Sequence, residues 1–220
     1  MKRILALFAA FAASVVMAQT PAVPQQAQIE FSVANPKVEP AHYSLTIRAN
    51  GTGEYKATYT PSGEDSAAAP VDRAISVHDP VLREVFAAAH KYHFFAMNCQ
   101  GHHQRVAFSG EKTLAYSGPD GKGTCRFNYS QENGINDVAA KLMAVAYTLT
   151  IGSELESEHR YDLLSLDAEL ASLQEAVENK QALDLANIAP TLESIAADGA
   201  VMNRARGRAR ELLHEASVTR

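Results

Sequence analysis

Four histidines and a cysteine lie close together in the chain and could bind a metal ion. His90 and His93 are spaced i, i+3, Cys99 follows, and His102 and His103 are adjacent. Imidazole and thiolate groups are the ligands that zinc and copper prefer. On a helical wheel His93 falls inside an apolar stripe and His90 at its edge, so the two rings should diverge. A metal site is therefore an alternative interpretation, and we expect no bound cofactor.

Ser109 and Lys112 match the S-x-x-K pattern of serine acyl-enzymes. That chemistry needs the serine at the start of a helix and the lysine one turn later. The surrounding pattern instead predicts a turn between strands, and neither S-D-N nor K-T-G is present. The chain also lacks G-x-S-x-G, P-loop, G-x-G-x-x-G and H-E-x-x-H motifs. We interpret the S-x-x-K match as chance and predict no catalytic residues, with a hydrolase of unrecognised type as another alternative.

Cys99 and Cys125 are the only cysteines. In an exported protein such a pair is expected to form a disulfide, which would leave Cys99 unable to bind a metal. Closing this loop would stabilise the fold by roughly 3–4 kcal/mol in the chain-entropy model. The spacing is not C-x-x-C, which disfavours a redox-active pair.

Charge is distributed unevenly along the second half of the chain. Residues 154–198 hold eleven acidic and two basic residues. Solvated helix faces explain such a run, and a docking surface for a basic partner is the functional alternative. A basic run follows, whose members do not share one helix face and are expected to pair with the acidic helices: Arg204, Arg206, Arg208 and Arg210.

Composition excludes several classes of protein. The 220 residues are 46% hydrophobic and 20% charged, with a formal net charge of −5. The chain is too apolar for a disordered protein. Its acidic balance argues against a nucleic-acid partner. A globular protein remains.

The N-terminus has the pattern of a secretory signal. Lys2 and Arg3 precede an apolar run over residues 4–16, and the small residue Ala18 predicts cleavage before Gln19. Residues 19–28 contain two prolines and read as a flexible leader. The apolar run is shorter than the roughly 20 residues of a membrane span. We expect a periplasmic or secreted protein with no transmembrane segment after signal cleavage.

Residues 29–133 have the pattern of an α+β lobe. Tyr43, Leu45 and Ile47 alternate with polar residues, residues 50–53 form a Gly-rich turn, and a second alternating run follows, which predicts a β-hairpin. Asp79 is expected to cap a helix that begins at Pro80 and ends in Phe94 and Phe95. Three short strands are expected at residues 105–108, 112–116 and 124–129.

Residues 134–220 are expected to form a helical lobe packed on the first. The first helix is apolar on more than one side, which predicts burial between the sheet and the remaining helices. Pro190 predicts a kink or a restart in a later helix. The predicted fold class is α+β, with a small antiparallel sheet packed on a helix and followed by a C-terminal antiparallel helical lobe.

Three segments of the first half resemble an uncharacterised domain family of exported bacterial proteins. They are residues 43–55 (YSLTIRANGTGEY), the helix ending in Phe94 and Phe95, and a later hairpin that contains residues 112–116 (KTLAY). The resemblance covers about residues 29–129 and implies no catalytic residues. The helical half lies outside it.

These patterns favour an exported, non-catalytic binding or assembly module of the cell envelope. Its partner would be another envelope protein that docks on the acidic helices. The alternatives are a metal-binding protein using His90, His93, His102 and His103, and the hydrolase named above.

Overall fold

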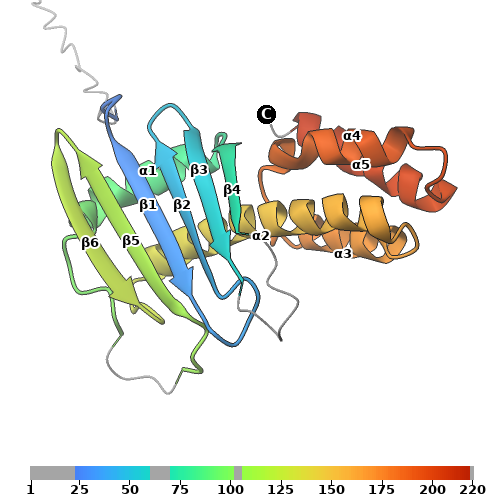
Figure 1. Ribbon diagram of the computed structural model, residues 1–220. Helices are drawn as coiled ribbons and strands as arrows, with labels where there is room; N and C mark the ends of the chain where they lie inside the picture. The colour runs from blue at the N-terminus through green and yellow to red at the C-terminus, as the bar shows by residue number, and fades with distance from the viewer. Residues whose placement is uncertain (1–22, 60–69, 102–105, 219–220) are drawn as a thin grey trace, which may run out of the picture.

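The computed structural model describes residues 23–59, 70–101 and 106–218, which form a six-stranded antiparallel sheet followed by a helical lobe (Figure 1). The predicted α+β class is confirmed. The sheet has the strand order β4-β3-β2-β1-β5-β6. Its strands are β1 (Gln28–Ala34), β2 (His42–Arg48), β3 (Thr52–Thr58), β4 (Val71–Ser76), β5 (Glu111–Gly118) and β6 (Gly121–Phe127).

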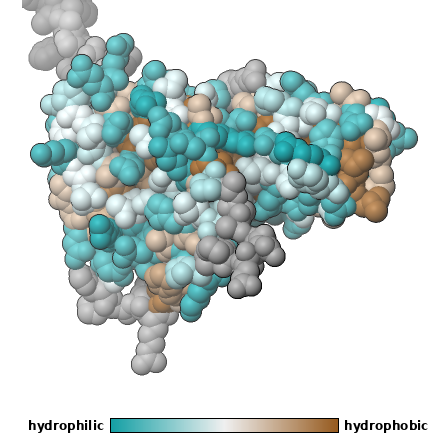
Figure 2. Space-filling model, in the orientation of Figure 1, coloured by the Kyte–Doolittle hydropathy of each residue, from teal (hydrophilic) through white to brown (hydrophobic). Residues whose placement is uncertain are grey.

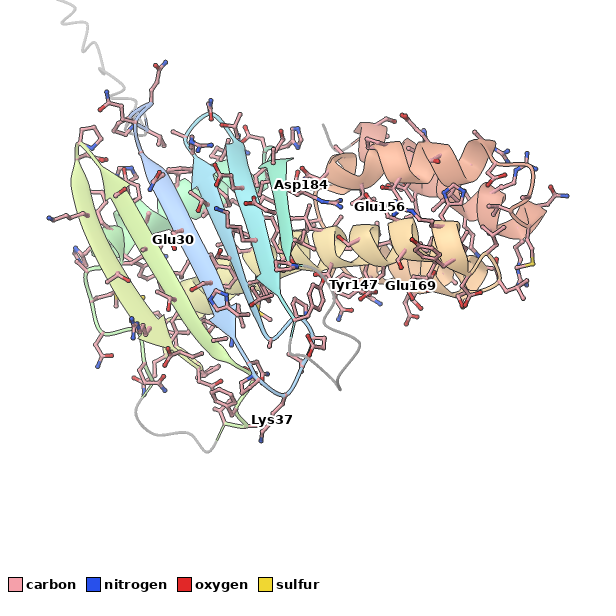
Figure 3. The ribbon with its side chains drawn as sticks, viewed as in Figure 1. Glu30, Lys37, Tyr147, Glu156, Glu169 and Asp184 are labelled. Carbon is pink, nitrogen blue, oxygen red and sulfur yellow. A yellow bond between two sulfur atoms is a disulfide. The ribbon has the colours of Figure 1, made fainter. Side chains whose placement is uncertain are left out.

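Alternation along the strands gives the sheet one buried face and one open face. Phe31, Leu45 and Tyr55 are fully buried beneath the helices. Glu30 lies on the open face (Figure 3), opposite Thr46 in the β1–β2 register. Successive side chains of a strand point to opposite faces, which is why the alternating pattern predicted the β2–β3 hairpin correctly.

Helix α1 (Val81–Lys91) covers the buried face with an apolar stripe that includes Val85 and Phe86. The predicted N-cap of this helix, Asp79, is wrong. Pro80 occupies the N-cap position without a side-chain hydrogen bond. The Asp79 carboxylate instead lies 3.6 Å from the Arg83 guanidinium.

A left-handed turn, η1 (His93–Phe95), follows α1, with φ angles of 53°, 56° and 63°. Each such residue costs roughly 1–2 kcal/mol. The backbone of η1 lies close against β6, since a Cβ on Gly123 would lie 2.5 Å from both the Phe94 carbonyl oxygen and the Ala96 nitrogen. Phe95 is fully buried by this arrangement. Packing against the sheet therefore offsets the strain of the turn.

The predicted disulfide is confirmed. Cys99 and Cys125 are bonded, with a Cα–Cα distance of 5.7 Å. The bridge ties the segment after η1 to β6. A disulfide is compatible with an oxidising, extracytoplasmic location.

The segment before β5 is not the strand that the sequence predicted at 105–108. Residues 106–110 have no regular structure, and residue 105 lies outside the described residues. The Asn128 side chain replaces a strand partner here. Its amide donates to the Ala107 carbonyl oxygen at 3.1 Å and accepts from the Ser109 N–H at 2.9 Å. The other two predicted strands correspond to β5 and β6.

Helix α2 (Asn133–Tyr161) joins two hydrophobic cores. Seven of its residues between Ile135 and Leu149 belong to the core beneath the sheet, whereas Ile151 and Leu155 belong to the core of the helical lobe. The helix therefore runs through both lobes instead of lying between them (Figure 1). By length and composition α2 could also cross a membrane, but 61% of its apolar window is buried inside the protein.

The helical lobe comprises the end of α2 with α3 (Leu166–Glu178), η2 (Leu185–Ile188), α4 (Ala189–Ala197) and α5 (Asn203–Val218). Pro190 lies in the first turn of α4, directly after η2, which confirms the predicted restart. Tyr161, the last residue of α2, and Leu164, in the loop that follows, are exposed. Figure 2 shows hydrophobic residues gathered at this far end of the lobe.

Candidate functional site

The helical lobe meets the sheet at the free edge of β4. The Ser76 N–H donates to Asn187 Oδ1 at 2.8 Å, and Asn187 Nδ2 donates to the Ser76 carbonyl oxygen at 2.8 Å. Asn187 Nδ2 also donates to the Asp184 carbonyl oxygen at 3.0 Å. The amide thus pairs with an edge that would otherwise expose unpaired backbone groups.

Two residues beyond Ser76, a histidine–aspartate pair continues this junction. The His78 N–H donates to Asp184 Oδ1 at 3.1 Å, and His78 Nδ1 lies 2.9 Å from the same oxygen. Asp184 has a left-handed backbone, with φ 57°, and its side chain is only 5% exposed. Figure 3 shows it between β4 and the helical lobe.

The second carboxylate oxygen, Asp184 Oδ2, is buried and has no hydrogen-bond partner among the described residues. Buried polar atoms are nearly always hydrogen-bonded. Burial raises the pKa of Asp184, although the hydrogen bonds from His78 act in the opposite direction. A donor at Oδ2, particularly a cationic one, would therefore stabilise the ionised carboxylate.

Asp184 and His78 line a pocket of about 670 Å³ between the lobes. One wall is formed by the start of α1 and the first half of α2, and the other by the end of α3 and the linker to η2. Apolar side chains that include Val81, Val177 and Leu183 contribute to both walls. Ligand pockets commonly form at such junctions, with a few polar groups in an apolar lining.

Acidic groups outnumber basic ones around this pocket. Five carboxylates line it, against the two lysines Lys141 and Lys180: Asp79, Glu84, Asp137, Asp184 and Glu215. One of the two lysines is already paired, because Lys141 Nζ lies 3.1 Å from Glu84 Oε2. No hydroxyl or thiol side chain is among the described residues that line the pocket. The arrangement is suited to holding a ligand.

Sequence reasoning did not find this pocket. In the sequence Asp184 is only one member of the acidic run over residues 154–198, and no pattern distinguishes His78. Their hydrogen bond joins residues 106 positions apart. The one local signal was the position of Asp184 between two helical patterns, where a left-handed aspartate is common.

The predicted histidine cluster is not assembled in the described part of the chain. His90 Nε2 lies 3.5 Å from Asp120 Oδ2, and its ring packs edge-on against Phe94 and Tyr116. His93 lies on the left-handed turn, beyond the end of α1, and is exposed. The prediction that placed it in an apolar helical stripe is wrong, because the helix ends at Lys91.

His102 and His103 lie outside the described residues. Within the described ranges, no group of three or more His, Cys, Asp or Glu side chains could hold a metal ion. Cys99 is occupied by the disulfide.

The acidic run divides into paired and unpaired groups. Glu156 binds Arg73 at 2.9 Å, and Asp167 binds both Arg204 and Arg208, as predicted for these arginines. Glu154, Glu158 and Glu169 form no ion pair with another described residue. The pKa of both Glu154 and Glu158 is raised, mainly by burial and secondly by repulsion from Glu169. The docking surface stays a prediction.

The structure does bring the S-x-x-K residues together. Lys112 Nζ lies 3.0 Å from Ser109 Oγ, at the start of β5 rather than on a helix.

Comparison with known proteins yields no family, since no protein-family model and no curated protein sequence matches the chain. The resemblance to an exported bacterial domain family stays a prediction.

Proposed function

We propose that this protein is an exported, non-catalytic binding module of the cell envelope, and that the pocket between its lobes holds a small organic ligand. The observation that carries the proposal is Asp184, which lines a pocket of about 670 Å³ and whose buried carboxylate oxygen Oδ2 has no partner among the described residues. A fixed acceptor in an apolar lining is the usual composition of a ligand site.

The chemistry of the pocket favours a protonated amine with an apolar body. An ammonium group would donate to Asp184 Oδ2 and match the excess of carboxylates in the lining. The apolar body would contact Val177 and Leu183. A carboxylate ligand would face repulsion from the same acidic groups.

Export to the periplasm or medium is supported by the signal-like N-terminus and by the disulfide. The intact mass of protein secreted by a bacterial host tests it. We expect a chain that begins at Gln19 and lacks two hydrogens. An unprocessed chain recovered from the cytoplasm would refute export.

The ligand site is tested by titrating isotope-labelled protein with octylammonium and with octanoate, observed by amide NMR. We expect octylammonium to shift resonances of residues that line the pocket. Asp184→Asn should weaken this binding about tenfold, because a charge-assisted hydrogen bond is lost.

Asp198→Asn is the matched control for this experiment. Asp198 forms a similar pair with His159, at 2.9 Å, but is not among the pocket residues. Its binding should equal that of the wild type. Equal binding of octanoate would refute the amine class alone, and no shift at the pocket with either compound would refute the ligand site.

A further inference from the structure

Lys112 is a buried lysine whose polar contacts are all uncharged. Only 7% of Lys112 is exposed. Its Nζ lies 3.0 Å from Ser109 Oγ, 3.0 Å from the Asn128 carbonyl oxygen and 3.4 Å from the Gly110 carbonyl oxygen. Lysine is seldom buried without a carboxylate partner, and no described residue forms an ion pair with this one. Burial lowers the pKa of the Lys112 ammonium.

Ser109 is exposed, yet both of its donors are fixed by one side chain. Asn128 Oδ1 accepts from the Ser109 N–H at 2.9 Å and from its hydroxyl at 3.1 Å. The Asn128 backbone N–H donates to Gln100 Oε1 at 2.9 Å. The serine hydroxyl is therefore open to solvent and held beside the lysine nitrogen.

The hydrogen bonds around Lys112 can be satisfied in both protonation states. A charged ammonium donates to all three oxygens, and the Ser109 hydroxyl donates to Asn128 Oδ1. A neutral amine donates to the two carbonyl oxygens of Gly110 and Asn128, and its lone pair accepts the Ser109 hydroxyl proton. Proton transfer between serine and lysine thus leaves no buried donor unpaired.

We propose that Ser109 is a nucleophile that accepts an acyl group from an activated ester, with neutral Lys112 as its base. The Ser109 O–H bond breaks, its proton passes to Lys112 Nζ, and a bond forms between Oγ and the acyl carbon. The C–O bond of the ester then breaks, and the alcohol leaves with the electron pair and the proton carried by Lys112. An amine base beside a serine is an established way to activate this nucleophile.

The neighbouring side chains suggest the acyl class. Val106 and Phe108 are 41% and 55% exposed directly before Ser109. They provide apolar surface for a short hydrocarbon chain, so the acyl group is expected to be apolar. The proposed step adds one acyl group per chain and involves no turnover, so it is compatible with a non-catalytic binding module. This site shares no residue with the pocket between the lobes, so the two proposals can fail separately.

The probe is p-nitrophenyl hexanoate, with release of p-nitrophenol and intact protein mass as readouts. We expect one hexanoyl group per chain, mapped to Ser109. Ser109→Ala should abolish this adduct. Ser117→Ala, which changes an exposed serine further along β5, should leave it unchanged.

The role of Lys112 is tested with two variants and a pH profile. Lys112→Met removes the base, and Lys112→Arg keeps the charge but cannot accept a proton near neutral pH. Each should acylate about a hundredfold more slowly than the wild type. The wild-type rate should rise with pH and level off below the ordinary pKa of lysine.

The proposal is overturned if no adduct forms at Ser109, or if both folded lysine variants react at the wild-type rate. Should neither variant fold, a wild-type rate that keeps rising beyond the ordinary lysine pKa would overturn it as well.

Discussion

Replacing Asn187 with alanine should loosen the helical lobe from the sheet. The side chain makes three hydrogen bonds, two to the backbone of Ser76 and one to the Asp184 carbonyl oxygen. Each is worth about 1 kcal/mol net, and less where water can replace it. The two bonds to Ser76 are exposed, so we expect Asn187→Ala to lower the free energy of unfolding by about 2 kcal/mol.

Urea denaturation followed by circular dichroism measures this loss. Gln181→Ala is the matched control, because it removes a carboxamide from the exposed linker between α3 and η2 and should change stability by less than about 0.5 kcal/mol. Hydrogen exchange at the Ser76 amide should also accelerate in Asn187→Ala alone. A loss no larger than that of the control would refute the view that this amide fastens the two lobes.

Three further predictions follow from contacts elsewhere. Replacing Cys99 and Cys125 together with alanine should lower the free energy of unfolding by about 3.5 kcal/mol in urea melts, from the 26-residue separation of the bridge. Because burial raises the pKa of Asp184, its protonated form favours the native state. Its contribution to stability is therefore present below about pH 4 and is lost as pH rises through the raised pKa. The free energy of unfolding of the wild type minus that of Asp184→Asn, measured by urea melts at several pH values, should fall in this range. A difference that is independent of pH would contradict the prediction. Gly123→Ala should lower the free energy of unfolding by about 2 kcal/mol, because the new Cβ would meet the backbone of η1. Gly207→Ala, with nothing within 4 Å of its Cβ, should raise stability by up to about 1 kcal/mol, and equal effects of the two glycine variants would refute the close approach.

Local patterns predicted the elements that local physics determines. The alternation of Tyr43, Leu45 and Ile47 reports one buried sheet face, and the β2–β3 hairpin has that register. The restart at Pro190 follows from its missing N–H. The cysteine pair was predictable because only one pairing was possible.

Features that depend on distant contacts could not be predicted. The end of α1 is set by the left-handed turn at His93, which packs against the glycines of a strand about 30 residues later. The strand expected at 105–108 is replaced by hydrogen bonds to the Asn128 side chain. The pocket exists because Asp184 meets His78 across 106 residues. No periodicity in the sequence encodes such a contact.

The most direct test of the ligand site is a crystal structure of the protein with octylammonium. We expect the ammonium nitrogen within about 3 Å of Asp184 Oδ2, with the alkyl chain against Val177 and Leu183. Octylammonium bound only elsewhere, or Asp184 Oδ2 bonded to a group of the protein itself, would contradict it.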